Sequence, residues 1–366
     1  MSIDLKATAA QFQIFGDIGD ISNYGSGHIN DTYMVQLNLA GRPVRYIMQR
    51  INSAIFTNPP QLMDNICRVT DHLRQKLNAD GADEPSRRTL TVIPSRDGKS
   101  YYHDAAGNWW RMYLFIEGAR TFDVIERPEQ AYEAARAFAR FQNQLADLPA
   151  PRLTETIPNF HNIRTRLAAL DAAAESDCCG RLKDVADELE FVNSRRGVMS
   201  RLLERHERGE IPERITHNDT KINNVMIDDR DGTGVCVIDL DTVMPGLALY
   251  DFGDMIRTAT ASAAEDETDL SKVGSRFDMF EALVRGYRSE ARFLLPAEIE
   301  ELAFSGQVIT FTIGVRFLTD YLAGDVYFKT HRPGHNLDRC RTQFAMVKDM
   351  EAQAERRNAL VKSMEV

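Results

Sequence analysis

The sequence predicts an α+β chain with a small, mainly antiparallel β lobe at the N-terminus and a larger, mainly helical lobe after it. Up to residue 117, apolar and polar residues alternate in short runs that are broken by glycine. From residue 128 onward, apolar residues recur at helical spacing in longer, alanine-rich segments. The chain has 366 residues, and single cores rarely grow beyond about 250–300 residues. We therefore expect two domains, 1–117 and 118–366.

The composition of the chain is typical of a globular protein and argues against some functional classes. Hydrophobic residues make up 43% of the chain and charged residues 27%, which is ordinary for a globular protein. The net charge of −10 argues against a nucleic-acid binder, which would carry a basic face. The N-terminus lacks the pattern of a secretory signal, and no run of about eighteen apolar residues occurs. We therefore expect a cytoplasmic protein without membrane contact, and nothing implies a protein partner.

A glycine-containing loop precedes the first clear strand. Alternation over residues 32–39 predicts this strand, and the loop before it reads Gly25, Ser26, Gly27 and His28. Glycine permits positive φ and close approach of the backbone, so such a loop can lay N–H groups over phosphates. The alternative is a simple turn.

The rest of the N-terminal lobe has further strand signals and one helix. Residues 44–50 read as a strand, and 59–77 carry apolar residues at helical spacing. Residues 90–94 and 100–102 flank an Asp-Gly turn and predict a hairpin. The run from Trp110 to Ile116 predicts the last strand of this lobe.

The second lobe begins with a proline-started helix over 128–148. Amphipathic segments then predict further helices, which are 163–170, 182–191, 198–207, 278–288 and 298–322.

One stretch within this lobe contains candidate catalytic residues. His217 and Asp219 are followed by Asn224, with an Asp two residues after a His and an Asn five residues after that Asp. This is the spacing of a phosphotransferase catalytic loop, in which the Asp takes the hydroxyl proton and the Asn binds a metal ion. A hairpin pattern follows and ends at Asp239. A His-x-Asp match can arise by chance, but the ordered set is much harder to obtain by chance.

Mg²⁺ prefers oxygen ligands, typically one or two carboxylates beside the phosphates. Asn224 and Asp239 fit that role. The tripeptide Asp251-Phe252-Gly253 competes with Asp239, because it looks like the metal-binding signature of protein kinases. We favour Asp239, which ends the hairpin, and expect Asp251 and Asp254 to open the next helix or to support the loop.

The motifs HNDTKINN and VIDLDTVMPGLALYDFGD resemble those of the aminoglycoside phosphotransferase and choline kinase superfamily. The resemblance covers most of the chain. Within it they look most like the N-acetylhexosamine 1-kinases. The resemblance implies a two-lobed, protein-kinase-like fold and ATP- and Mg²⁺-dependent phosphorylation of the anomeric hydroxyl of GlcNAc or GalNAc. ATP and a small amino sugar would then be the only partners.

The resemblance also suggests roles for individual residues. Asp219 would be the base, His217 would brace the loop, and Lys221 would balance charge on the transferring group. Where related kinases carry a strand lysine, this chain has Gln49 and Arg50, so Arg50 would supply the cation or would be merely solvated. The adenine would contact Phe115 and Ile116, unless these residues only fill the core of the small lobe.

Sugar sites need planar donors and an aromatic face. Arg316 and Tyr327, in and after an apolar helix, are candidates, although a structural Arg–Asp pair with a core aromatic explains them as well. Homoserine, choline or an aminoglycoside remain alternative acceptors. A catalytically silent nucleotide-binding protein is a further alternative, which the missing strand lysine favours slightly.

Overall fold

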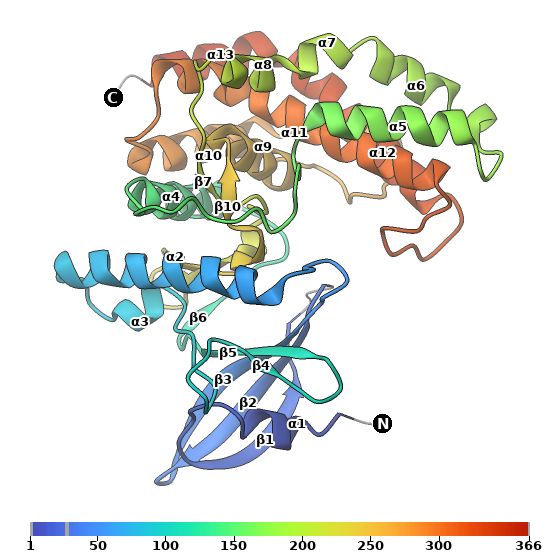
Figure 1. The fold of residues 1–366 in the computed structure, drawn as a ribbon. Helices are drawn as coiled ribbons and strands as arrows, with labels where there is room; N and C mark the ends of the chain where they lie inside the picture. Colours follow the sequence, from blue (N-terminus) through green and yellow to red (C-terminus); the bar gives the residue numbers. More distant parts are fainter. Residues whose placement is uncertain (1–2, 26–28, 365–366) are drawn as a thin grey trace. The chain divides into compact units, whose positions relative to one another are not determined.

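The computed structural model describes residues 3–25 and 29–364 (Figure 1). The chain divides into two compact units: a first unit of Met1–Arg120, Asp147–Pro158 and Val225–Met244, and a second of Thr121–Ala146, Asn159–Asn224 and Pro245–Val366. The first crossing lies three residues after the boundary expected at 117, and the chain then returns twice to the first unit.

The first unit is built on an antiparallel sheet, as the sequence predicted. Five strands lie in the order β1-β2-β3-β5-β4. Their bounds are β1 Asp17–Asn23, β2 Asp31–Leu39, β3 Arg42–Ile51, β4 Tyr102–His103 and β5 Trp109–Leu114. The helices of this unit are α1 Leu5–Ala9, α2 Pro59–Ala79 and α3 Pro85–Arg88. Asn58 caps α2 by accepting from Gln61 N, and the two prolines that follow fit its first turn.

The hairpin predicted over 90–94 and 100–102 is wrong, although a turn does form at Ser95–Lys99. Its two arms pair with β5 rather than with each other. Ile93 N donates to Met112 O, while Tyr102 pairs with Trp110. The apolar β5 offers both arms a partner, and local alternation cannot reveal which neighbour a strand will choose.

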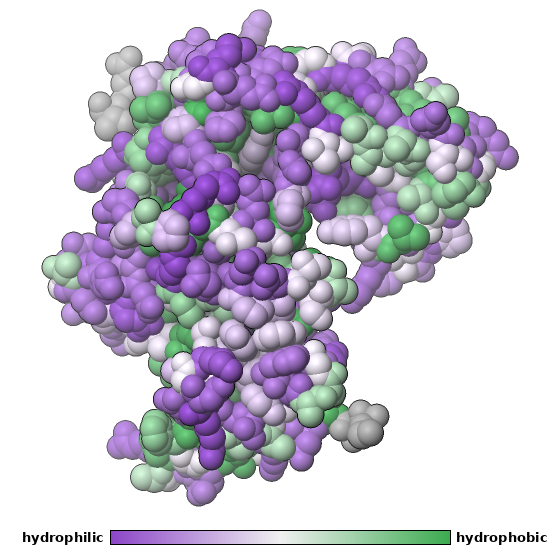
Figure 2. Space-filling view, viewed as in Figure 1, coloured by the Kyte–Doolittle hydropathy of each residue, from purple (hydrophilic) through white to green (hydrophobic). Residues whose placement is uncertain are grey.

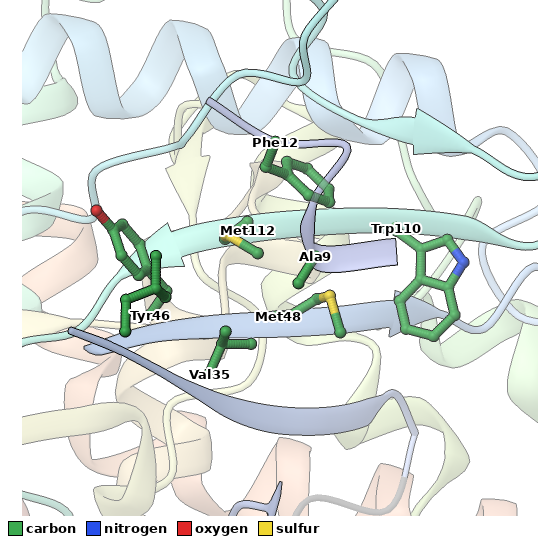
Figure 3. Close-up of a cluster of buried hydrophobic side chains, with 8 residues drawn as sticks. Ala9, Phe12, Val35, Tyr46, Met48, Trp110 and Met112 are labelled. Atoms are coloured by element: carbon green, nitrogen blue, oxygen red, sulfur yellow. The ribbon is translucent and has the colours of Figure 1, made fainter. Parts of the chain in front are cut away.

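One face of this sheet is apolar and the other carries polar side chains. The apolar face holds the hydrophobic core drawn in Figure 3, which consists of Ala9, Phe12, Val35, Leu37, Tyr46, Met48, Trp110 and Met112. Because successive side chains in a strand alternate between faces, Gln49 and Arg111 point to the opposite face. These two residues are also direct partners in the β3–β5 register.

A second sheet of the first unit contains the hairpin predicted after the catalytic motif. Its strands lie in the order β6-β8-β9, with β6 Ala119–Arg120, β8 Val225–Asp228 and β9 Gly234–Val237. A short 3₁₀ helix, η3 (Leu240–Thr242), follows β9, and β10 (Met244–Gly246) spans the last crossing between the units.

The second unit is mainly helical. Its elements are α4 Pro128–Leu145, α5 Ile163–Ser176, η1 Leu182–Asp184, α6 Ala186–Asn193, α7 Arg196–Met199, α8 Arg201–Glu207, β7 Arg214–Thr216, η2 Ile222–Asn224, α9 Ala248–Ala259, η4 Leu270–Lys272, α10 Phe277–Glu290, α11 Pro296–Leu322, α12 His335–Ala352 and α13 Ala354–Ser363.

Helix α11 is the core of this unit. It packs against α12, α9 and α5. By length and composition alone it could cross a membrane, but 89% of its most apolar window is buried inside the unit. On the face drawn in Figure 2 the outer residues are mainly hydrophilic, with hydrophobic ones scattered among them. The apolar character of α11 therefore serves packing.

The close approach of α9 to α11 requires glycine. A Cβ at Gly253 would collide with the carbonyl oxygen of Ser305 on α11, and one at Gly306 would press on Ile256. Gly253 is the last residue of the tripeptide Asp251-Phe252-Gly253, so this tripeptide lies inside a packed helix. Its aspartate consequently sits in the first turn of α9.

Candidate active site

The predicted catalytic loop joins β7 to η2 in the second unit. Asp251 on α9 holds its first residues through their backbone. His217 N donates to Asp251 Oδ2 at 2.8 Å, and Asn218 N donates to Asp251 Oδ1 at 2.7 Å. Gln142 Nε2 also donates to Asp251 Oδ2, at 2.5 Å. Asp251 is therefore engaged as a support of the loop within this unit.

Burial makes the carboxyl group of Asp251 a weaker acid than an ordinary aspartate. Asp251 is fully buried, and burial raises the pKa of its carboxyl group to about 7, although the N–H donors of His217, Asn218 and Gln142 oppose the shift. Tyr287 donates its hydroxyl to Gln142 Oε1, so the donor from α4 is itself held in place.

Asp254, one turn further along α9, supports the next part of the loop. Its Oδ2 accepts from Thr220 N at 3.1 Å, and its Oδ1 accepts from Arg257 Nε at 2.8 Å. Burial acts to raise the pKa of Asp254, but the neighbouring basic groups, first among them Arg257, together outweigh burial and the pKa is lowered. Two neighbouring carboxylates on one helix face thus have opposite pKa shifts, because only Asp254 has a cation beside it.

The side chain of Asp219 lies between a cation and an amide. Lys221 Nζ is 3.2 Å from Asp219 Oδ2, and Asn224 Nδ2 donates to Asp219 Oδ2 at 3.1 Å and to Asp219 O at 2.8 Å. The Asp219 side chain keeps 27% of its surface exposed, whereas the adjacent Asn218 and Thr220 are buried. The loop therefore presents one reachable carboxylate, flanked by a positive charge.

The two histidines near the loop are buried. The Nδ1 of His217 accepts from Asp219 N at 3.3 Å, and its ring packs edge-on against Phe138. His161 Nε2 donates to Asn218 O at 3.1 Å, and burial lowers the pKa of His161 to about 4. Both rings are thus placed to hold the loop backbone, and His161 is a loop contact that the sequence reasoning missed.

A cavity of about 270 Å³ adjoins the loop in the second unit. Its lining includes Lys221 and Asn223 from the loop, together with Arg257, Glu265 and Arg276. Glu265 pairs with Arg257 at 3.2 Å. The cavity wall close to Lys221 is thus richer in cations than in carboxylates.

The other predicted metal ligand, Asp239, belongs to the first unit, whereas Asp219 and Asn224 belong to the second. Asp239 has a left-handed backbone, with φ of 58°, and begins η3. Two residues later, Asp241 is buried and accepts from Arg111 with both oxygens, one of these bonds measuring 3.0 Å. Sequence reasoning missed Arg111, although a charged residue inside an apolar strand signals a buried partner.

The nucleotide-side predictions have mixed outcomes in the structure. Gly25 has a left-handed φ of 79°, and Ser26, Gly27 and His28 lie outside the described residues. Arg50 forms an exposed ion pair with Asp31 on β2. Because of strand alternation, it lies on the face of the sheet opposite to Gln49.

The two candidates for the adenine contact differ in exposure. The Phe115 ring lies edge-on to Tyr24, with centroids 5.6 Å apart, and under the Arg45 guanidinium at 4.0 Å. Ile116 is buried. Nothing in the structure tests their contact with adenine, which stays a prediction.

The predicted acceptor-site pair comes together in the second unit. Arg316 Nη2 is 3.5 Å from the Tyr327 hydroxyl, and its guanidinium lies 5.4 Å from the ring centres of Phe160 and Phe328. Phe160 adjoins the loop-holding His161. Asp320 fixes the segment that carries Tyr327, because it accepts from three successive backbone N–H groups there.

Two arginines share this aromatic surrounding. Among the described residues, no carboxylate lies within ion-pair distance of Arg316 or of Arg166. Burial lowers the pKa of both, and the charge of Arg316 helps to bring the pKa of Arg166 to about 10. The structural Arg–Asp pair that the sequence offered as an alternative for Arg316 is therefore not formed.

Comparison with known proteins decides the family. The model of the phosphotransferase enzyme family matches residues 20–282, which is more than half of the chain. The chain belongs to the phosphotransferase enzyme family. The prediction of a small-molecule phosphotransferase is thereby confirmed at the level of the family.

Solved structures share the fold at low identity. A microcompartment-associated aminopropanol kinase matches with a TM-score of 0.58 and 16% identity, covering 97% of this chain and 98% of its own. An ethanolamine kinase of Plasmodium vivax matches with a TM-score of 0.55 and 12% identity, covering 88% and 82%. A GDP complex of aminoglycoside 2'-phosphotransferase-IIIa matches with a TM-score of 0.52 and 12% identity, covering 90% and 93%. These likenesses confirm the two-lobed, protein-kinase-like α+β fold.

Among residues 3–25 and 29–364, no group of three or more His, Cys, Asp or Glu is placed to hold a metal ion. The expected Mg²⁺ would instead need an amide and carboxylate oxygens beside the phosphates. Asn224 fits such a role, because its amide nitrogen donates to Asp219 and its amide oxygen remains as the ligand atom.

Proposed function

We propose that this phosphotransferase moves the γ-phosphoryl group of ATP to the anomeric hydroxyl of an N-acetylhexosamine, GlcNAc or GalNAc. The observation that carries the proposal is the supported loop of the second unit. It presents Asp219 as a reachable carboxylate, with Lys221 beside it. A carboxylate in this setting can accept the hydroxyl proton while the oxygen attacks the phosphorus.

The other loop residues would set the geometry of this step. His217 and the two α9 carboxylates hold the loop backbone, which keeps Asp219 directed at the acceptor. Lys221 would stabilise negative charge on the transferring group. Asn224 and Asp239 would hold Mg²⁺, which when bound neutralises charge on the phosphates.

The charge around Arg316 supports a neutral acceptor. A cationic acceptor needs carboxylates or an aromatic cage that is free to receive it. Here the aromatic rings of Phe160, Tyr327 and Phe328 already surround a guanidinium. Arg316 and Arg166 are both cations, and among the described residues neither forms an ion pair with a carboxylate, so further positive charge would be repelled. An acetamido carbonyl or a sugar hydroxyl would instead accept hydrogen bonds from Arg316.

The names of the structural neighbours favour a second candidate, a kinase of a small amino alcohol such as aminopropanol or ethanolamine. Homoserine, choline and aminoglycosides belong to the same alternative. A panel of these acceptors with GlcNAc and GalNAc, assayed by ADP release with MgATP, separates the candidates. ³¹P NMR of the product would then locate the phosphate on the acceptor.

We expect turnover with the N-acetylhexosamines, and a phosphate on the anomeric oxygen. Turnover of a cationic amino alcohol alone would overturn the sugar assignment. An absence of ADP release with every acceptor, from folded protein, would favour a silent nucleotide-binding protein.

A further inference from the structure

Phosphate-transferring kinases place a cation on the third strand and pair it with a carboxylate from the neighbouring helix. Between β3 and α2, which the structure describes in full, no such ion pair forms. Strand β3 carries Gln49 at this place, and the acids of α2, Asp64 and Asp71, are exposed. The buried polar residues of α2 are Asn65 and Thr70, and neither is a carboxylate.

A different ion pair lies on the face of the sheet to which Gln49 points. Arg111 comes from β5, directly opposite Gln49, and its Nε donates to Gln49 Oε1 at 2.9 Å. Its Nη1 and Nη2 each donate to a separate oxygen of Asp241, so the pair is bidentate. The side chains of Arg111 and Asp241 are 1% and 4% exposed. Burial acts to lower the pKa of Arg111, but the charge and hydrogen bonds of Asp241, together with the other acidic groups nearby, outweigh it and the pKa is raised.

Asp241 also joins the glycine-containing loop to this pair. Asn30, two residues after the loop, donates from Nδ2 to Asp241 Oδ2 at 2.6 Å, and its Oδ1 accepts from Asn52 N at 3.0 Å. Both oxygens of Asp241 are therefore used by protein donors.

Two further contacts hold the backbone within η3 and directly after it. Thr156 Oγ1 donates to Asp241 O at 2.8 Å, and Asn65 Nδ2 donates to Val243 O at 3.2 Å. The segment that begins at Asp239 is thus held by the sheet, by α2 and by the residue that follows the glycine-containing loop. All of these contacts lie within the first unit.

We propose that Arg111 is a positioning residue. Through its buried pair with Asp241 it fixes the segment of Asp239 and, through Asn30, the base of the glycine-containing loop. It thereby replaces, from β5, the missing cation of β3. The inference rests on the proposed function, because it assigns Asp239 to the Mg²⁺ of the nucleotide complex.

The burial of the Arg111–Asp241 pair favours a role in positioning rather than a role in stabilising the fold. Taking two charges out of water costs about as much as their attraction returns, so a buried ion pair is weak evidence for a stabilising role. A bidentate pair in which each nitrogen of the guanidinium and each oxygen of the carboxylate holds a hydrogen bond does fix geometry. Groups that orient metal ligands typically change metal affinity or activity about 10–100-fold when they are removed.

The test measures ATP binding by calorimetry over a series of Mg²⁺ concentrations, without acceptor. In Arg111→Lys, which keeps the charge but loses the bidentate fork, we expect the Mg²⁺ concentration for half-saturation to rise about 10–100-fold. The KM for the acceptor should change little. Arg195→Met is the matched control, since it removes a bidentate pair with Glu351 in the second unit, and its Mg²⁺ requirement should stay that of the wild type.

A double variant separates positioning from folding. Arg111→Met with Asp241→Leu removes both charges, and such replacement of a buried pair by apolar residues is often neutral for stability. We expect this variant to fold but to keep the raised Mg²⁺ requirement. A folded double variant or Arg111→Lys with the wild-type Mg²⁺ requirement would overturn the inference.

The proposed function can fail separately. Wild-type protein that binds MgATP but phosphorylates no acceptor overturns the acceptor assignment alone, and the shift between wild type and Arg111→Lys still decides the role of Arg111. Wild-type protein that binds no nucleotide at any Mg²⁺ concentration overturns both.

Discussion

The catalytic loop of the second unit and the end of the β8–β9 hairpin in the first unit each carry an acidic residue at or beside a left-handed backbone position. Asn218 has φ of 64° and precedes Asp219, and Asp239 has φ of 58°. Such positions are strained for residues other than glycine and persist only where the surroundings hold them. The two regions are held in opposite ways.

In the loop, carboxylates from α9 accept backbone N–H groups, and the side chains of His217 and Asn224 add contacts to the backbone of Asp219, whose own side chain bonds no loop backbone group. At the hairpin end, the support depends on a side chain of the segment itself, Asp241, which pairs with Arg111. The loop should therefore tolerate a change of the Asp219 side chain. The hairpin end should be sensitive to changes two residues away from Asp239.

The strongest test of this contrast is Asp219→Asn. Asparagine nearly matches aspartate in shape, and the loop backbone is held from α9, so folding and MgATP binding should persist. The variant cannot accept the hydroxyl proton, and general-base contributions are typically about 10²–10⁴-fold in rate. Steady-state ADP release beside calorimetry with MgATP measures both. Near-normal turnover, or nucleotide binding lost in step with activity, would show that Asp219 is not the base.

Asp239→Asn probes the hairpin end directly. We expect Mg²⁺-supported turnover to be lost while the urea midpoint of unfolding stays close to that of the wild type, because the buried support comes from Asp241. The Mg²⁺ dependence of ADP release and a urea titration are the measurements. If turnover and its Mg²⁺ dependence both survive, Asp239 is not the metal ligand.

Asp251→Asn should have the opposite effects, namely lower stability with only a partial loss of turnover. An asparagine offers only one oxygen to the N–H groups of His217 and Asn218, so one buried donor loses its partner, at a cost of about 1–3 kcal/mol. The free energy of unfolding in urea should fall accordingly, with a partial loss of activity. A stable Asp251→Asn that has lost its Mg²⁺ response would identify Asp251 as the metal ligand and show that Asp239 was the wrong choice.

Arg316→Met tests the acceptor side of the second unit. Hydrogen bonds to charged groups contribute about 1.5–3 kcal/mol, so the acceptor KM should rise about 10–100-fold. Methionine retains much of the apolar contact with Phe160 and Phe328, and MgATP affinity should not change. Initial rates at varied acceptor concentration give the KM. An unchanged KM together with lower stability would show that Arg316 only packs among the rings.

The same contrast explains what the sequence could predict. The catalytic loop and the hairpin that follows were recognisable, because their spacing and turn signals are local. The support of the loop from α9 was open to inference only as an alternative role for Asp251 and Asp254. Its hydrogen bonds depend on the close packing of α9 and α11 at Gly253, which no local pattern reveals.

At the hairpin end the sequence was less informative. The role of Arg111 depends on its register opposite Gln49 and on a partner 130 residues away in the chain. The sequence analysis named Arg50 as the cation and did not consider Arg111. Strand alternation against the core of Met48 and Trp110 places Arg50 on the other face. The wrong hairpin over 90–102 has the same origin, because pairing partners within a sheet are not encoded by local alternation.

The smallest expected effect is a dependence of stability on pH that belongs to Asp251 alone. Burial raises its pKa from 3.8 to about 7 in the folded chain. Between these values the folded chain holds a proton that the unfolded chain has released, so the contribution of Asp251 to stability falls as pH rises and is constant above the folded pKa. Between pH 6 and pH 8 this amounts to about 1.4 kcal/mol, the free energy of one pKa unit.

Comparison with Asp251→Asn isolates this contribution, because other groups titrate equally in both proteins. The pKa of Asp228 is lowered to about 2 by Arg230, so its contribution is lost only in acid and does not interfere. Urea unfolding at pH 6 and pH 8 gives the pH dependence of the free energy of unfolding for the wild type and for the variant. We expect the free energy of unfolding of the wild type to exceed that of the variant, and this difference to be about 1.4 kcal/mol smaller at pH 8 than at pH 6. A difference that is independent of pH would mean that the three N–H donors keep Asp251 ionised throughout, so that the loop is held by a permanent charge.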